Sequence, residues 1–280
     1  MARVLVTGTS GFVGGALARS LAASGQHEVF CISRKPSQVE GATCHRGLFH
    51  SFEDLRVFDD VDMDVVVHLA AVTGGCREED GICVNVEGTR KLIRYFIDRG
   101  CRKFVNASSI AAVGFQNPAF RPLQIPLPDE HPCLDRDGYG VSKYLMEEIT
   151  RYLALQNADI DAINLRLSTV IPDESKGNVG GLRPLGQWCL GGITMMLLTD
   201  AVRAFTLATE APLKPGVRIL NTAGPKVWAS APTAEILRNW WGDDVDVSFF
   251  DQPGNEFAGV YDVSRVRDEI GFEAICLPEF

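Results

Sequence analysis

The chain has 280 residues, a length that predicts one large domain or two intimately joined ones and that can bury a core without disulfides or metals. Its net charge of −9 argues against a nucleic-acid partner, which would need a basic surface. The longest apolar run, around Ile193–Leu198, is too short to cross a bilayer, and no signal peptide precedes the first strand. The eight cysteines form no Cys-x-x-Cys pair. We therefore expect a cytoplasmic protein with reduced thiols, no metal and no membrane partner.

Apolar runs alternate with segments of helical periodicity up to Arg166. The expected strands are Val4–Thr7, Glu28–Ser33, Val65–Leu69, Phe104–Ala107 and Asp161–Leu165. The helices expected between them are Gly11–Ser24, Glu87–Arg99 and Tyr139–Gln156. Because the strands are apolar throughout rather than alternating, they should be buried on both faces, as in a parallel sheet. The order of elements predicts an α/β fold with a Rossmann-like, doubly wound parallel sheet.

The pattern loosens after Arg166. Residues Pro172–Gly192 are rich in Gly and Pro and are expected to form a loop. Downstream we expect a helix at Thr199–Thr209 and a strand at Val217–Asn221, followed by helices at Ala231–Trp241 and Ser264–Ile270.

Three glycines, Gly8, Gly11 and Gly14, follow the first expected strand and open the first expected helix. A phosphate-binding turn needs such glycines for tight turning, for close approach of the backbone to a diphosphate, and for close packing of helix and strand. The helix N-terminus then presents free amides and the positive end of its dipole. A plain strand–helix turn is the alternative. We expect a dinucleotide to bind here, with contacts from Gly8, Ser10, Gly11, Phe12, Val13 and Gly14.

The end of the second expected strand indicates which dinucleotide is preferred. Enzymes that prefer NAD usually place an acidic residue there to accept hydrogen bonds from the ribose hydroxyls. This chain has Ser33, Arg34 and Lys35 instead. Ser33 leaves room for a 2′-phosphate, Arg34 can pair with it, and Lys35 can assist. These residues favour NADP(H), and NAD(H) is the alternative cofactor. A basic surface turn that binds no cofactor is the other interpretation.

Tyr139 and Lys143 are four residues apart and share one face of an expected helix. Upstream, a strand ends in Ser108 and Ser109, where open α/β sheets bind ligands. A free tyrosine, with a pKa of about 10, is a poor base at neutral pH, and a nearby ammonium lowers that pKa. We expect Tyr139 to be the acid/base of hydride transfer, Lys143 to tune it and contact the ribose, and Ser109 to hold the substrate oxygen. A surface Tyr–Lys pair is the alternative.

With these motifs in place, the chain resembles the NAD(P)-dependent epimerase/dehydratase family of extended short-chain dehydrogenases over nearly its whole length. Besides the glycine loop and the Tyr139–Lys143 pair, the resemblance rests on His68–Ala71, Asn85–Thr89, Ser109–Gly114, Asp262–Arg265 and Glu269–Phe272. The resemblance implies cofactor contacts from Leu69, Ala70, Ala71 and Asn85, and it assigns the active hydroxyl to Ser109 rather than Ser108. It also implies a homodimer formed through helices near residues 87–99 and 139–156.

The departures from the family pattern concern the substrate. Val113 stands where the family commonly has an aromatic residue, and Leu167–Pro172 replaces a run that often contains Asn and Val-Tyr-Gly-Pro. An arginine that often contacts the phosphates of a sugar nucleotide is missing from Gly254–Val260. Arg183 is a candidate substitute for it, with a solvated loop charge as the alternative.

These observations predict a dinucleotide-binding domain at residues 1–166, with 199–223 returning to it, and a substrate-binding part at 167–198 and 224–280. The leading functional prediction is an NADP(H)-dependent oxidoreductase acting on a small or sugar-like substrate. The alternatives are a nucleotide-sugar epimerase or dehydratase with tightly bound NAD, and a redox sensor that binds dinucleotide without turnover. Arg34 and the missing phosphate contact argue against the epimerase, and Tyr139 and Lys143 argue against the sensor.

Overall fold

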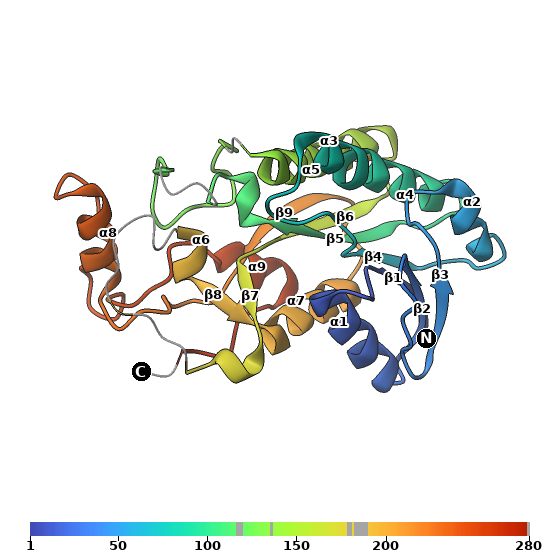
Figure 1. The fold of residues 1–280 in the computed structure, drawn as a ribbon, viewed down its shortest axis with the longest axis horizontal. Helices are drawn as coiled ribbons and strands as arrows, with labels where there is room; N and C mark the ends of the chain where they lie inside the picture. The colour runs from blue at the N-terminus through green and yellow to red at the C-terminus, as the bar shows by residue number, and fades with distance from the viewer. Residues whose placement is uncertain (116–119, 135–136, 178–180, 182–189, 279–280) are drawn as a thin grey trace. The chain divides into compact units, whose positions relative to one another are not determined.

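The structure is a computed structural model that describes all residues except 116–119, 135–136, 178–180, 182–189 and 279–280 (Figure 1). Its strands are β1 (Ala2–Thr7), β2 (His27–Ser33), β3 (Ala42–Arg46), β4 (Val65–His68), β5 (Lys103–Ser109), β6 (Asp161–Leu167), β7 (Thr169–Ile171), β8 (Met195–Leu197) and β9 (Gly216–Thr222). Its α-helices are α1 (Phe12–Ala23), α2 (Phe52–Leu55), α3 (Glu78–Asp80), α4 (Gly88–Ile97), α5 (Gly138–Gln156), α6 (Leu190–Ile193), α7 (Leu198–Glu210), α8 (Thr233–Trp241) and α9 (Ser264–Ile270). Short 3-10 turns lie at Arg56–Phe58, Ile110–Ala112 and Asp173–Ser175, and a π-helical turn, η2, spans Gly81–Glu87.

Seven strands form the main sheet, in the order β3-β2-β1-β4-β5-β6-β9. Each pairing from β3 to β5 is parallel, with Thr7 opposite His68 and also opposite Ile32 in the register. The chain order reverses between β1 and β4, and an open α/β sheet binds ligands at such a switch point. The predicted Rossmann-like, doubly wound parallel sheet is confirmed.

The six predicted strands and six predicted helices are all present, within two residues at almost every end. The strand β3 was not predicted, because its residues are all half-buried or exposed and form no apolar run. The long helix predicted at Glu87–Arg99 begins earlier, as the π-helical turn η2 that leads into α4. In the stretch predicted as loop, the structure describes the turn at Asp173–Ser175 and the start of α6 at Leu190.

Contacts divide the chain into two compact units. The first unit comprises residues 1–108, 137–165 and 205–219, and the second comprises 109–136, 166–204 and 220–280. Residues 109–136 belong to the second unit, whereas the division expected from the sequence placed them in the dinucleotide-binding domain. The assignment of substrate binding to 167–198 and 224–280 stays a prediction.

The first unit packs its helices on both faces of the sheet, with α4 and α5 on one side and α1 on the other (Figure 1). The core on one of these faces is built from fully buried aromatic side chains, among them Phe58, Phe96 and Phe104, together with Leu92 and Leu153. This burial fixes α5 against the sheet. The catalytic residues predicted on α5 therefore stand on a rigid element.

The second unit has its own core, in which Phe115, Leu237, Phe250 and Tyr261 are buried together. The Phe115 and Tyr261 rings meet edge to face at 5.0 Å. A small parallel pair of strands, β7 and β8, lies in the same unit. No helix among the described residues of either unit is both long enough and apolar enough to cross a membrane.

Candidate active site

The glycine loop after β1 leaves no room for side chains. Gly8 has φ +76°, a backbone conformation that favours glycine, and a Cβ there would lie 2.7 Å from the Ala70 nitrogen. A Cβ on Gly14 would lie 2.5 Å from the Gly8 oxygen. The Gly11 amide donates to that same oxygen at 2.9 Å, which closes the turn. The loop therefore has the tight geometry that the sequence predicts.

The N-terminus of α1 is open to an anionic ligand. Gly11 occupies the cap position, no side chain caps the helix, and no acidic residue lies in its first turn. Ser10, Gly11 and Phe12 are exposed at this point. A helix of twelve residues that begins with uncapped amides attracts phosphate oxygens, so the residues present fit the diphosphate of a dinucleotide.

A buried chain of hydrogen bonds supports the loop from below. The Thr7 hydroxyl accepts from the Leu69 and Ala70 amides at 3.2 Å, and lies 2.7 Å from His68 Nδ1. His68 Nε2 lies 3.0 Å from the Thr89 hydroxyl, which donates to the Asn85 carbonyl. Because Thr7 accepts two amides, its own hydrogen is directed at Nδ1, and Nε2 of a neutral His68 then donates to Thr89.

The environment of His68 keeps it neutral. Burial, together with the positive charge of Lys143, lowers the pKa of His68 to about 3. The Leu69–Ala71 segment, for which cofactor contacts were predicted, is thus held by a chain of neutral groups. No spacing in the sequence predicts that Thr7 and Thr89 both contact His68, because these contacts depend on the register of β1 with β4 and on the packing of α4.

Asn85 lies in the π-helical turn and is fully buried. Its Oδ1 accepts from the Val72 amide at 2.9 Å, and its Nδ2 donates to the Val72 carbonyl at 3.0 Å and to the Ser142 hydroxyl at 2.9 Å. The side chain therefore joins the segment after β4 to helix α5. A direct cofactor contact from Asn85 stays a prediction.

The end of β2 carries the residues predicted to select the cofactor. Ser33 is buried, and its hydroxyl donates to the Lys35 carbonyl at 2.6 Å, next to Ser37 at 3.3 Å. Ser37 in turn lies 2.8 Å from the Thr9 hydroxyl of the glycine loop. Arg34 and its neighbour Lys35 are exposed, and no side-chain hydrogen bond or ion pair joins either of them to another described residue. Both cationic side chains are thus available to a ligand.

Helix α5 begins at the site. The Asp137 carboxylate caps it by accepting from the Tyr139 and Gly140 amides at 2.8 and 2.9 Å. Lys143, one turn further, is buried, and its ammonium donates to the Ala107 carbonyl at 2.7 Å. The Lys143 Nζ lies 5.8 Å from the centre of the Tyr139 ring. The first unit therefore brings together Tyr139, Lys143 and the end of β5.

Burial lowers the pKa of Lys143 to about 8, while the negative charge of Glu147 acts in the opposite direction. An ammonium held this close to a phenol favours the phenolate form of that phenol. The buried ammonium therefore stands where it can act on the ionisation of the Tyr139 phenol.

The two neighbouring serines at the end of β5 have different surroundings. The Ser108 hydroxyl is buried and donates to the Glu147 carboxylate at 2.5 Å. Ser109, the first residue of the second unit, is half-buried, and its oxygen accepts from the Ala111 amide at 3.2 Å. Its own hydroxyl hydrogen has no acceptor among the described residues. Ser109 can therefore donate to a ligand, as the resemblance implies, whereas Ser108 cannot without losing Glu147.

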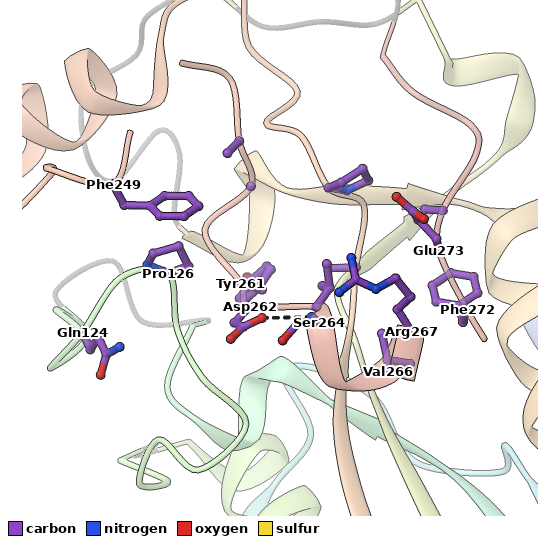
Figure 2. Close-up of a pocket in the computed structure, with 16 residues that line it drawn as sticks. Gln124, Pro126, Phe249, Tyr261, Asp262, Ser264, Val266, Arg267, Phe272 and Glu273 are labelled. Atoms are coloured by element: carbon purple, nitrogen blue, oxygen red, sulfur yellow. Dashed lines mark hydrogen bonds between the residues drawn. The ribbon is translucent and has the colours of Figure 1, made fainter. Parts of the chain in front are cut away.

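The second unit contains a cavity of about 520 Å³ (Figure 2). Phe249, Phe272 and Pro126 form apolar walls, while Asp262 and Arg267 bring charges to the rim. The Asp262 carboxylate accepts from the Ser264 amide at 2.9 Å, as the dashed line in Figure 2 marks. Asp262 and Ser264 belong to a run that resembles the family, and no sequence pattern predicts their place at a cavity. Arg183, the predicted substrate residue, lies outside the described residues.

A search of the described residues finds no group of His, Cys, Asp and Glu that could hold a metal ion. The seven described cysteines carry free thiols.

The chain matches the model of the NAD dependent epimerase/dehydratase family over residues 4–182. UDP-glucose 4-epimerase 2 of Arabidopsis thaliana is 26% identical over 203 residues, which are 65% of this chain and 56% of that protein. A 3-beta-hydroxysteroid dehydrogenase of Mycolicibacterium neoaurum is 34% identical over 126 residues, 40% of this chain and 33% of that protein. The chain spans about half the length of the first curated relatives it matches.

Solved structures match the fold over almost the whole chain. A short-chain dehydrogenase/reductase superfamily protein from Agrobacterium tumefaciens with bound NAD has a TM-score of 0.72 and 23% identity, covering 97% of this chain and 92% of that one. The UDP-glucose 4-epimerase of Thermotoga maritima with UDP-glucose has a TM-score of 0.69 and 18% identity, covering 98% and 94%. At such identities these structures establish the fold alone. Because the family model matches well over half of the sequence, the chain belongs to the NAD dependent epimerase/dehydratase family.

Proposed function

We propose that this chain is a nicotinamide-dependent oxidoreductase that prefers NADP(H) and moves a hydride to or from a carbonyl or alcohol carbon of a small or sugar-like substrate. The observation that supports it best is the buried Lys143 ammonium beside Tyr139, in the same unit as the glycine loop. A protein that only senses a dinucleotide has no need of a buried ammonium beside a tyrosine ring.

Each part of the reaction falls to a named group. The bound nicotinamide supplies or accepts the hydride. Tyr139 gives its proton to the carbonyl oxygen in reduction and takes it back in oxidation, and Lys143 makes this transfer accessible at neutral pH. Ser109 donates a hydrogen bond to the same oxygen, which polarises the carbonyl and stabilises the developing negative charge.

The preference for NADP(H) rests on the end of β2. The guanidinium of Arg34, which has no ion pair within the described part of the chain, can form two parallel hydrogen bonds to a 2′-phosphate, and Lys35 adds a second positive charge. No acidic side chain stands among Ser33, Arg34 and Lys35 to receive the ribose hydroxyls of NAD.

A second candidate is a nucleotide-sugar epimerase or dehydratase that keeps NAD bound and returns the hydride to the same substrate. The names of the relatives favour it, since UDP-glucose 4-epimerases recur among them. The missing arginine in Gly254–Val260 disfavours it, because a sugar nucleotide carries two phosphates that need cationic partners.

One experiment separates the two candidates. The cofactor released from the purified protein is identified, and NADPH and NADH are then titrated by fluorescence. Tighter binding of NADPH and a cofactor that exchanges freely support the reductase. Stoichiometric retained NAD supports the epimerase and removes the NADP(H) preference. A panel of aldehydes, ketones, sugars and nucleotide sugars then identifies the substrate class by consumption of NADPH.

We also propose a homodimer formed through α4 and α5. Tyr152 and Leu155 on α5 are exposed, Leu155 at 87%, and together they give the end of this helix an apolar surface. Changing Leu155→Glu would put a charge into such an interface, so we expect sedimentation to show a dimer for the parent chain and a monomer for the variant. Leu213→Glu, an exposed leucine outside both helices, is the control and should leave the dimer intact. A parent chain that sediments as a monomer would refute the dimer.

A further inference from the structure

The first unit holds a buried carboxylate that the proposed reaction does not use. Glu147 lies on α5, one helical turn after Lys143, and is 1% exposed. Its oxygen Oε1 accepts from the Ser108 hydroxyl at 2.5 Å. A hydroxyl that donates at this distance stabilises the ionised form of a carboxylate. A buried charge is costly unless another charge or a hydrogen bond compensates it.

Lys143 and Glu147 bind consecutive residues of β5. Lys143, itself 3% exposed, donates to the carbonyl of Ala107, and Glu147 accepts from the hydroxyl of the next residue, Ser108. Two side chains one turn apart on α5 thus attach to the last residues of β5 before Ser109. This attachment sets both the position and the surroundings of the Lys143 ammonium.

Four groups bear on the charge of Lys143. Tyr139 lies one turn before it and Glu147 one turn after it on the same helix. His68, neutral at the end of β4, and the Cys76 thiol of the segment after β4 influence it from other elements. Burial disfavours the ammonium, and Glu147 is the strongest of the groups that favour it. Without that carboxylate, desolvation would leave Lys143 neutral at a lower pH.

We propose that Glu147 is a positioning residue of the reaction: held by Ser108, its buried carboxylate keeps the Lys143 ammonium charged and fixed beside Tyr139. This inference rests on the proposed function, in which Lys143 acts on the Tyr139 phenol. Glu147 has no direct part in proton transfer, because eight residues of helix separate it from Tyr139. Along the helix axis this amounts to about 12 Å.

The test follows the Tyr139 phenol itself and needs neither substrate nor turnover. Ionisation of Tyr139 is titrated by ultraviolet absorbance on the full chain, with the Tyr139→Phe form of each variant as its blank. Glu147→Gln keeps the shape of the side chain and removes the charge. We expect the apparent pKa of Tyr139 to rise by about one unit, a tenfold loss of phenolate at a given pH, because the neighbouring ammonium is lost.

Matched variants separate the charge of Glu147 from other effects. Glu148→Gln removes an equal charge from the next residue, where the carboxylate is paired on the surface with Arg151, and should leave the titration unchanged. Glu147→Asp retains the charge and should stay nearer the parent than Glu147→Gln. Ser108→Ala removes only the hydrogen bond and should raise the apparent pKa of Tyr139 by a smaller amount.

An unchanged Tyr139 titration in Glu147→Gln, or an equal shift in Glu148→Gln, would overturn the proposal. Should Glu147→Gln not fold, Ser108→Ala decides: a rise supports the proposal and no change refutes it. Failure of the proposed function would give a different result. Turnover would then survive Tyr139→Phe, while the Tyr139 titrations of the Glu147 and Ser108 variants would still shift as expected.

Discussion

The glycine loop and helix α5 of the first unit differ from the cavity of the second unit in how their polar groups are held. In the first unit, His68, Asn85, Lys143 and Glu147 are buried, and each is hydrogen-bonded to a neighbouring strand, helix or loop of the same unit. At the cavity, Asp262, Arg267 and Glu273 are exposed to water. Buried polar groups in fixed positions suit chemistry that every substrate shares, whereas exposed charges can change with little cost to folding.

Among the changes that test this difference between the two units, removal of the Tyr139 hydroxyl should have the largest effect on activity. In Tyr139→Phe the substrate oxygen has no proton donor or acceptor, so we expect kcat to fall by about 10²- to 10⁴-fold. The glycine loop is untouched, and the dissociation constant of NADPH should change less than about threefold. Steady-state kinetics and fluorescence titration measure the two quantities. Retained turnover would show that the rigid unit does not supply the acid/base.

Acid should destabilise the first unit through His68. The pKa of His68 in the folded protein is about 3, below its ordinary value of about 6.5. The unfolded chain therefore binds a proton between these values while the folded chain does not, so the stability contributed by neutral His68 is present above pH 6.5 and is lost as pH falls towards 3. A shift of this size corresponds to several kcal/mol in the free energy of unfolding.

Urea unfolding at pH 7 and at pH 4.5 measures the effect. His68→Asn should be less stable than the parent at pH 7, because the chain from Thr7 to Thr89 is broken, yet should lose less on acidification. His50→Asn is the control for removal of a histidine from the same unit. Equal acid sensitivity in the parent and His68→Asn would show that His68 is not the group that acid protonates.

The site predicted to select the cofactor combines both features of this comparison. Arg34 belongs to the first unit, like the buried polar groups, but its side chain is exposed, like the charges at the cavity. Arg34→Asp places a carboxylate where NAD-preferring enzymes have one, and it repels a 2′-phosphate. We expect NADPH to bind about 10- to 100-fold more weakly, the loss of a charged hydrogen bond, while NADH binds as well or better. Fluorescence titration of both cofactors decides. An equal loss for NADPH and NADH would mean that Arg34 does not contact the 2′-phosphate.

The same contrast explains what could be predicted from the sequence. The glycine loop and the Tyr139–Lys143 pair are local patterns, whose geometry follows from one turn and one helical repeat. The Thr7–His68–Thr89 chain and the Ser108–Glu147 bond join residues 21 to 61 positions apart. Such contacts depend on the register of strands and on which face α5 packs against the sheet, and no spacing in the sequence encodes them.

The cavity was harder still to predict. Its lining comes from four stretches of the second unit, represented by Gln124, Ala223, Phe249 and Asp262, and only the last of them includes a predicted helix and runs that resemble the family. Residues 109–136 were also hard to assign: they lie between predicted elements of the domain at residues 1–166, but they pack in the second unit. Loops leave little periodicity to read, because they lack the repeats that define helices and strands.

The smallest expected effect belongs to the cavity. The only ion pair of Arg267 among the described residues is with its exposed neighbour Asp268, at 3.2 Å, so Arg267→Gln should change the free energy of unfolding by less than about 1 kcal/mol. If the cavity receives part of the substrate, this variant should raise KM by about 2- to 10-fold and leave kcat within about twofold, because a contact that is the same in the ground state and the transition state changes binding and not the chemical step. Arg238→Gln removes an arginine that is also exposed and paired, with Asp251 at 2.7 Å, but does not line the cavity, and should leave both constants unchanged. A fall in kcat for Arg267→Gln would place the cavity close to the chemistry, and the contrast between a rigid catalytic unit and an adaptable binding unit would then be wrong.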